Sequence, residues 1–395
     1  MDDRFRVDFK SVVEDVLRDL GSLRSGREGG VFTKKEYRAE VVVPVAASVC
    51  NTFIAQPLDN KRERGQFYTA VNAFNHDAFH RWLKGIQGFP DLKVVEPFAG
   101  ANNIVQMLDD LGYGLLKWEA FDVAPEAQGE NSTRIAVEQR DTLENYPEGF
   151  QVAITNPPYL AKNSAVRRGI SFPETAYEDL YQLALEQMLS HTAYVAAIVP
   201  ESFLTQGRFF SRLRVFISLP FKMFEDTETP VCLVLFGPEE HDDFAVWTGG
   251  SYLGTYRSLE QYLPKSSCPD SRWVFNDPNG FIFLQAIDSS SGPSIGFCCA
   301  SRAKAVVVKE SSRSQTLIGW KGKQVLTAKE TELVVARANA LIAIHRRETQ
   351  DSFLTAFKGL RKDGQFRRRL DFKTARCFLD QALSDLGLSA RSCDA

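Results

Sequence analysis

The sequence predicts an α/β protein built around a mostly parallel sheet, and two observations support this prediction. Between residues 90 and 240, short apolar runs alternate with amphipathic stretches of helical spacing. Strands that alternate with helices form a parallel sheet covered on both faces. After about residue 245 the alternation stops, because glycines and prolines interrupt the chain repeatedly. We therefore expect a second domain of different architecture there.

The elements of the first domain follow from its apolar residues. Strands are predicted at 92–95, 118–123, 152–155, 194–199, 221–224 and 231–236. Helices are predicted around Phe79 and Trp82, at 104–111 and at 177–189, where apolar residues recur at helical spacing. Ligands of such sheets bind beyond the carboxyl ends of the strands. The residues that directly follow strands are therefore the first candidates for a functional site.

A chain of 395 residues is too long for one small core, which favours two domains. We predict a helical N-terminal extension at 1–60 and a sheet domain at 61–245. A basic α+β domain is predicted at 246–395, with a helix at 327–347. The longer of these segments are of the usual size for independent domains.

Composition indicates a soluble globular protein, with 44% hydrophobic and 25% charged residues. There is no apolar run of about 18 residues, so no membrane span is expected. The charged N-terminus lacks the apolar core of a signal peptide. Seven cysteines are scattered without a CxxC pair, which predicts reduced thiols in the cytoplasm and no metal site.

Charge is distributed unevenly along the chain, although the formal net charge is only −3. From residue 301 onward, 19 Lys and Arg stand against 10 Asp and Glu, a balance of +9 that leaves −12 for the first 300 residues. An acidic front and a basic back suggest that the last part faces an anionic partner such as nucleic acid, although a solvated basic surface is the alternative. The candidate phosphate contacts are Arg361, Lys362, Arg367, Arg368, Arg369 and Lys373, interleaved with Phe366 and Phe372.

The most informative segment is Asn156-Pro157-Pro158-Tyr159, which follows the apolar run 152–155. The two prolines fix the backbone as the chain leaves the sheet. The Asn156 side-chain oxygen and the Pro157 carbonyl would form a rigid pair of acceptors, with the Tyr159 ring beside them as a flat wall. Such a turn could grip a planar amino group, either the exocyclic amine of adenine or a glutamine amide. Taken alone, it could also be an ordinary turn.

Three further segments follow or precede predicted strands. The small-residue turn Glu96–Asn102 lets a ligand approach the backbone, but it lacks the glycines and lysine of a phosphate loop. Asp122 ends the second strand, where a carboxylate can accept both hydroxyls of a ribose. Asp141 follows Arg140 and could place a polar group beside a purine ring. Upstream, Phe67 and Tyr68 precede the first helix and could pack against a cofactor.

Taken in order, these segments resemble a known family. GQFYT at 65–69, EPFAG at 96–100, FD at 121–122, RD at 140–141 and NPPY at 156–159 are similar to the adenine-specific DNA methyltransferases of restriction–modification systems. The resemblance covers roughly residues 60–240. It implies a Rossmann-like methyltransferase fold with a seven-stranded sheet, a C-terminal target-recognition domain, and S-adenosylmethionine as cofactor. The implied reaction is methyl transfer to the N6 amine of a flipped-out adenine in a specific DNA sequence.

The resemblance also implies roles for individual residues. The catalytic residues would be Asn156, Pro157, Pro158 and Tyr159, with Asn156 also bordering the cofactor and Tyr159 stacking on the base. The cofactor would be held by Phe67, Tyr68 and Thr69, by Glu96, Phe98 and Gly100, by Asp122 at the ribose and by Asp141 at the adenine. Phe203, in the loop after the 194–199 strand, would border the base pocket. The family usually has proline at Ala70 and a second glycine at Asn102, so the Asn102 loop should be less permissive.

The expected partner is double-stranded DNA, and a cognate restriction endonuclease is compatible with the sequence without being required by it. Neither a membrane nor a metal is expected as a partner. Two other functions fit the same turn: methyl transfer to RNA adenine or to a protein glutamine, and non-catalytic binding of nucleic acid on a methyltransferase fold. A glutamine enzyme would not need the basic C-terminal domain, which favours nucleic acid.

Overall fold

The computed structural model describes residues 72–125, 134–220, 222–223, 229–265, 271–302, 312–321 and 326–388. All of them belong to one compact unit of the chain, Lys61–Ala395. The predicted N-terminal extension at 1–60 lies outside the described residues, as do Phe67, Tyr68, Thr69 and Ala70.

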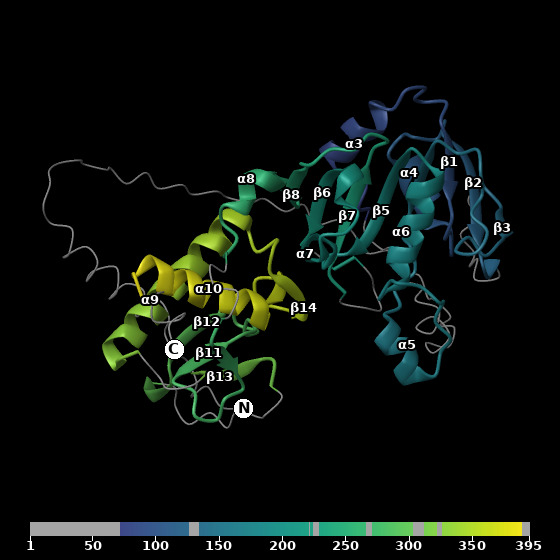
Figure 1. Ribbon diagram of the computed structural model, residues 1–395. Coiled ribbons are helices and arrows are strands. Elements are labelled where there is room, and N and C mark those ends of the chain that lie inside the picture. The colour runs from purple at the N-terminus through teal and green to yellow at the C-terminus, as the bar shows by residue number, and fades with distance from the viewer. Residues whose placement is uncertain are drawn as a thin grey trace, which may run out of the picture. The chain divides into compact units, whose positions relative to one another are not determined.

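A nine-stranded sheet in the order β3-β2-β1-β4-β5-β7-β6-β8-β9 forms the first part of the described chain (Figure 1). Its strands are β1 (Lys93–Glu96), β2 (Lys117–Asp122), β3 (Val137–Gln139), β4 (Val152–Thr155), β5 (Tyr194–Pro200), β6 (Leu213–Leu219), β7 (Val231–Phe236), β8 (Ala245–Thr248) and β9 (Ser251–Thr255). From β3 to β5 all neighbours are parallel, whereas β7 runs antiparallel to β5 and β6. The predicted Rossmann-like α/β class with a mostly parallel sheet is confirmed. The expected seven strands are β1 to β7, and β8 and β9 extend the sheet beyond residue 245.

Helices cover both faces of this sheet, because its central strands are apolar on both sides. The helices are α3 (Asp77–Lys84), α4 (Asn103–Asp110), α5 (Lys162–Arg168), α6 (Leu180–His191), α7 (Phe203–Gln206) and α8 (Tyr256–Glu260). Residues such as Val94 and Ile154 pack with α3 and α4 on one face. Their neighbours Val95 and Ala153 pack with α6 on the other. This alternation is the period-two geometry of strands buried between two helical layers.

The strand predicted at 221–224 is wrong, since residues 222–223 are not in a strand and the sixth strand is β6, at Leu213–Leu219. Two polar residues interrupt the apolar pattern of this strand in the sequence. The Arg214 side chain reaches Glu239, and the buried Ser218 hydroxyl donates to Glu201 Oε1 at 2.5 Å. Strand β3 has no predicted counterpart either, because its three residues at the sheet edge, one half-buried and two exposed, show no apolar run.

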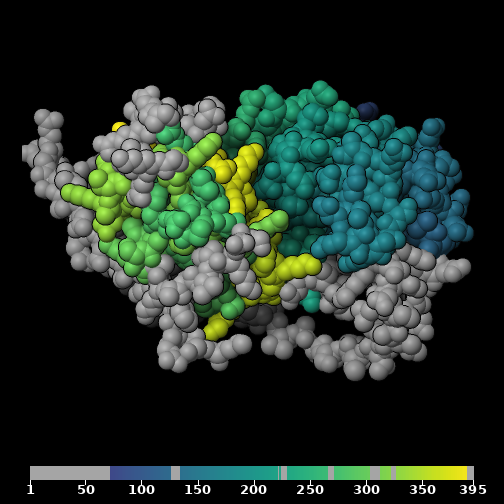
Figure 2. Space-filling model, turned by 60° about the horizontal axis from the view of Figure 1, so that its bottom comes forward, coloured from purple at the N-terminus to yellow at the C-terminus, as the bar shows by residue number. Residues whose placement is uncertain are grey.

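The C-terminal part has the predicted α+β composition. A four-stranded antiparallel sheet, β10-β13-β11-β12, is accompanied by a two-stranded hairpin and two long helices. The elements are β10 (Trp273–Phe275), β11 (Ile282–Gln285), β12 (Gly296–Cys299), β13 (Gln315–Trp320), α9 (Ala328–Thr349), β14 (Thr355–Leu360), β15 (Phe366–Arg369) and α10 (Phe372–Asp385). Strands and helices share one core, which includes Ile282, Val334 and Phe378. In the space-filling view, residues near the C-terminus, in yellow, reach the surface beside the green residues of this part (Figure 2).

Candidate active site

Three polar side chains end neighbouring strands of the large sheet. Glu96 ends β1, Asp122 ends β2 and Thr155 ends β4, and β1 lies between the other two. Because these strands are parallel, the three residues meet at one edge of the sheet, where ligands of such folds bind. The Thr155 hydroxyl donates a hydrogen bond to Glu96 Oε1 across the two strands. The sequence analysis missed this role of Thr155.

The loop between β1 and α4 is tied to the end of β2. The backbone N–H of Ala99 donates to the Phe121 carbonyl at 2.8 Å, and that of Gly100 donates to Asp122 Oδ2, also at 2.8 Å. The second Asp122 oxygen accepts from Ala124 N–H at 2.8 Å. Asp122 therefore fixes the loop, and its contact with ribose hydroxyls remains a prediction.

Asn102 occupies the position where the family usually has a second glycine. It caps α4 in the left-handed conformation, with φ of 60° and ψ of 27°. Asparagine is one of the few residues besides glycine that adopt this conformation readily. Its side chain also donates to the Ile135 carbonyl at 3.0 Å. The loop thus keeps the turn expected of glycine, and the side chain anchors it to the segment before β3.

Asp141 lies on the loop after β3. Its neighbours connect this loop to the loop after β1 and to the end of β2. The Thr142 hydroxyl donates to the Pro97 carbonyl at 2.7 Å, and Arg140 N–H donates to the Asp122 carbonyl at 2.9 Å. The Asp141 side chain is exposed and accepts from Leu143 N–H at 3.0 Å. The structure therefore brings Glu96, Gly100, Asp122 and Asp141 onto connected loops. Their predicted contacts with a cofactor remain predictions.

Glu96 is fully buried, and burial raises its pKa to about 8. Its Oε1 accepts from Thr155 and from Phe98 N–H, the latter at 3.1 Å. Its Oε2 is buried and has no hydrogen-bond partner among the described residues. A buried acceptor without a donor is costly. A donor from a ligand at this edge of the sheet would satisfy it.

The turn after β4 is held from inside the protein. Pro157 is buried, whereas Asn156 and Tyr159 are half-buried. The Tyr159 hydroxyl lies 2.5 Å from Asn156 Oδ1 and 2.6 Å from the Ile198 carbonyl on β5. Its ring packs against the apolar residues of both faces of the sheet. Tyr159 thus links the turn after β4 to the neighbouring strand, and its stacking on a base remains a prediction.

Phe203 lies on α7, after β5, and is only 1% exposed. Its ring contacts the rings of Phe210 and Phe236. Phe203 therefore supports the loop after β5 from within the core. In the described structure it does not present its ring to solvent, where nucleic acid would reach it.

Two of the predicted phosphate contacts, Arg361 and Arg368, are buried and form ion pairs within the protein. Arg368 donates to Glu201 Oε2 at 2.8 Å, and Arg361 donates to Asp288 Oδ2 at 3.3 Å. Their exposed fractions are 5% and 6%. A sequence pattern of basic residues does not show which of them are paired internally. The burial of these two arginines was therefore not predicted.

The other predicted contacts are more accessible. Lys362 and Lys373 are exposed, and Arg367 and Arg369 are half-buried. Arg367 donates to the Asp288 carbonyl at 2.6 Å and lies over the Phe357 ring. Their contact with phosphate remains a prediction.

Helix α5 follows the turn Asn156–Tyr159 closely in the chain and was not predicted from the sequence. It begins three residues after Tyr159 and stands apart from the strands (Figure 1). Pairing of Ala161 with Asp179 closes the segment that carries it. Its exposed residues include Lys162, Arg167 and Arg168, together with Val166, which is 71% exposed. Three cations within ten residues of the turn were the signal that could have identified it.

None of the described helices is long and apolar enough to span a membrane. Within the described ranges, no group of three or more His, Cys, Asp or Glu side chains could hold a metal ion.

The central segment of the chain is similar to a known protein family. Residues 101–221 match the family model of the Eco57I restriction-modification methylases. The predicted resemblance to restriction–modification methyltransferases is confirmed over this segment. The matched segment includes Asp122, Asp141 and the turn at 156–159, but neither Glu96 nor the C-terminal part. No curated protein matches the chain.

Several solved structures share limited similarity with the chain. A putative class I S-adenosylmethionine-dependent methyltransferase from Listeria monocytogenes is 17% identical, with a TM-score of 0.30 over 41% of this chain and 57% of that one. A type I restriction-modification methyltransferase subunit from Streptococcus thermophilus is 16% identical, with a TM-score of 0.33 over 47% of each chain. A modification subunit of a putative type I restriction enzyme from Vibrio vulnificus is 13% identical, with a TM-score of 0.31 and the same coverage. The chain thus spans about half the length of these proteins, and similarities at this level carry no argument.

Proposed function

We propose that this protein transfers a methyl group from S-adenosylmethionine to the exocyclic N6 amine of adenine in DNA. The observation that carries the proposal is the turn Asn156–Tyr159, which leaves β4 beside the loop Glu96–Asn102 at one edge of the sheet. The hydrogen bond from Thr155 to Glu96 connects the two. In the proposed reaction, this arrangement would bring an acceptor pair for an amine next to the loop that holds the cofactor.

The residues at this edge fit the proposed cofactor. S-adenosylmethionine, when bound, supplies an activated methyl group and carries an ammonium group and two ribose hydroxyls. The buried Glu96 Oε2, which has no partner among the described residues, would accept from the ammonium group, whose positive charge favours the ionised form of Glu96. Asp122 would accept from the ribose hydroxyls and Asp141 would border the adenine. Phe67, Tyr68 and Thr69 are proposed at the methionine end, by resemblance alone.

The catalytic turn acts on the target amine through position and charge. Asn156 and the Pro157 carbonyl would accept the two amine hydrogens, which favours a pyramidal nitrogen whose lone pair points at the methyl group. Alignment of this kind and fixed acceptors account for much of the acceleration in such reactions. The amine proton can leave after the transfer, so no general base is needed beforehand. An adenine in a duplex would have to flip out to reach this turn.

DNA is the favoured substrate because basic residues lie near the turn and in the C-terminal part. Lys162, Arg167 and Arg168 are exposed on α5, and Lys362 and Lys373 are exposed in the C-terminal part. Lysine and arginine neutralise backbone phosphates and supply the sequence-independent part of DNA affinity. Such contacts position a duplex, whereas sequence is read by other side chains at base edges.

The test is transfer of a tritiated methyl group to duplex DNA, RNA and protein in parallel. We expect label in adenine of DNA, and we expect Asn156→Ala to lower the rate by about a hundredfold or more. Asn279→Ala is the matched control, because Asn279 is exposed on a turn of the C-terminal part. Label only in RNA or only in protein would contradict the proposed substrate. Absence of S-adenosylmethionine binding by calorimetry would contradict the reaction itself.

A further inference from the structure

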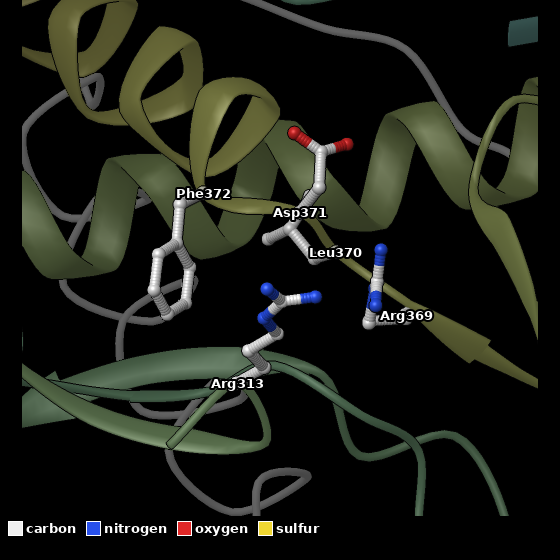
Figure 3. Close-up of a pocket in the computed structure, with 5 residues that line it drawn as sticks. All are labelled: Arg313, Arg369, Leu370, Asp371 and Phe372. Atoms are coloured by element: carbon white, nitrogen blue, oxygen red, sulfur yellow. The ribbon is translucent and has the colours of Figure 1, made fainter. Parts of the chain in front are cut away.

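A pocket of about 190 Å³ lies in the C-terminal part, away from the residues discussed so far as catalytic. It is lined by Arg313, Arg369, Leu370, Asp371 and Phe372. Arg313 comes two residues before β13, and the other four run from the end of β15 to the first residue of α10. Figure 3 shows the Arg313 guanidinium between the Phe372 ring and the Arg369 side chain. Two segments that are far apart in the sequence thus bring two cations to one cavity.

The positive charge of this pocket is not neutralised by the described side chains around it. The structure records no ion pair for Arg313 or Arg369 within the described ranges, and the buried Arg369 Nε has no hydrogen-bond partner there. Asp371 is committed elsewhere, because its two oxygens accept from the N–H and hydroxyl of Thr374 at 2.9 and 2.8 Å. Its carboxylate points away from Arg313 (Figure 3). The pocket therefore holds two arginines and no carboxylate directed at them.

The neighbouring arginines of the same domain show that this arrangement is unusual. Arg346 and Arg361 pair with Asp288, and Arg368 pairs with Glu201. With two arginines and one aspartate, the pocket lining carries a net charge of +1. The two cations repel each other, and a buried donor without an acceptor costs free energy. An anion that accepts from both guanidinium groups removes both costs. Planar guanidinium groups match the oxygens of phosphate especially well.

We propose that this pocket binds a phosphodiester of the DNA backbone between Arg313 and Arg369. Phe372 forms its apolar wall, since its ring is stacked on Phe275 with centroids 4.5 Å apart and 18° between the planes. Such a wall suits the sugar or base next to a bound phosphate. The inference rests on DNA as the substrate and adds Arg313, which the pattern of basic residues from 361 onward does not include.

The experiment measures duplex DNA binding by fluorescence anisotropy at several salt concentrations. The double variant Arg313→Gln, Arg369→Gln should bind about tenfold or more weakly and lower the slope of log K against log salt by about 2. The matched control is the double variant Arg302→Gln, Arg347→Gln. Both of its arginines are well exposed and paired with carboxylates, Glu332 and Glu348. An unchanged slope in the pocket variant would overturn the proposal.

Two further measurements separate the possible outcomes. Arg313→Gln alone changes only an exposed residue, so it tests the site even if the double variant does not fold; its slope should fall by about 1. Inorganic phosphate is titrated as a probe by calorimetry. Phosphate binding together with an unchanged DNA slope would assign the pocket to free phosphate and sink the proposal. If the protein binds DNA with the expected slopes but transfers no methyl group, the proposed reaction fails while the phosphate site stands.

Discussion

The hydroxyl of Tyr159 carries one proton but lies within hydrogen-bond distance of two oxygens, Asn156 Oδ1 and the Ile198 carbonyl. Both oxygens are acceptors, and the Tyr159 hydroxyl is the donor in both contacts. The hydroxyl therefore orients the Asn156 side chain relative to β5. In the proposed reaction the same Asn156 oxygen would accept from the substrate amine with its other lone pair.

We therefore expect Tyr159→Phe to lower the rate of methyl transfer although the aromatic ring remains. Loss of the hydroxyl removes the group that orients Asn156, and one such hydrogen bond corresponds to about a tenfold change. We expect kcat to fall by about that factor with little change in KM for DNA, as measured by steady-state transfer. Tyr177→Phe is the control, since Tyr177 also donates to a side chain, Glu186 at 2.9 Å. Full activity of Tyr159→Phe would leave stacking as the only role of the residue.

Glu96 gives a second prediction at the same scale, about stability and pH. Burial raises its pKa from 4.5 to about 8, so the folded protein holds a proton near neutral pH that the unfolded chain has released. A raised folded-state pKa contributes stability that is present below the unfolded pKa and is lost as pH rises through the folded one. The free energy of unfolding should therefore fall between about pH 5 and pH 8.

Glu96→Gln should flatten that fall, because glutamine is neutral at every pH. The measurement is urea denaturation of both proteins at pH 5, 6, 7 and 8, without added cofactor. The difference between the two slopes should approach one proton per molecule. Parallel curves would show that Glu96 is ionised in the folded protein.

At the scale of single elements, the sequence predicts what local composition determines. Strands β4 and β7 were predicted at their observed bounds, because both are continuous apolar runs that the sheet buries on its two faces. Strand β6 was missed because Arg214 and Ser218 interrupt its pattern, and only tertiary contacts with Glu239 and Glu201 explain them. The polar loops of the site were predicted from their position after strands. The burial of Arg361 and Arg368 could not be, since it depends on carboxylates 73 and 167 residues away.

Helix α5 carries a prediction of its own. If its cations contact DNA beside the turn, the triple variant Lys162→Gln, Arg167→Gln, Arg168→Gln should weaken duplex binding and lower the salt slope by about 2 to 3. The side chains of all three are exposed, so the fold should tolerate the change. Affinity for S-adenosylmethionine, measured by calorimetry, should stay the same. An unchanged salt slope would rule out phosphate contacts by α5.

For the molecule as a whole, the excess of basic residues from residue 301 onward serves two different purposes. The excess of +9 from residue 301 onward suggests one large anion-binding surface. In the structure, Arg346 and Arg361 instead surround the buried Asp288, and Arg368 pairs with Glu201. The charges available to an external anion are therefore fewer than the sequence suggests. Arg313 and Arg369 are among those that remain.

The internal cluster around Asp288 predicts a large effect on stability. Asp288 is fully buried, accepts from both terminal nitrogens of Arg346 at 2.8 Å, and accepts from Arg361. Although burial opposes it, the hydrogen bonds from Arg346 hold the pKa of Asp288 below its usual range. Asp288→Asn removes the buried counter-charge that Arg346 and Arg361 share, although both keep Asp351. Removing one partner of a buried pair costs about 3–5 kcal/mol. Because Asp351 remains, the free energy of unfolding at pH 7 should fall by at most about that amount.

The pH dependence of this effect has a definite sign. A depressed folded-state pKa contributes stability that is present above the unfolded pKa and is lost as pH falls through the folded one. The difference between the protein and Asp288→Asn should therefore shrink when denaturation is repeated below pH 4. Asp363→Asn is the control, because Asp363 contacts the same Arg361 at 2.9 Å but its side chain is 48% exposed. Exposed pairs contribute about 0–1 kcal/mol, so the control should lose little stability. Equal losses of unfolding free energy in the two variants would mean that burial does not strengthen the contribution of Asp288.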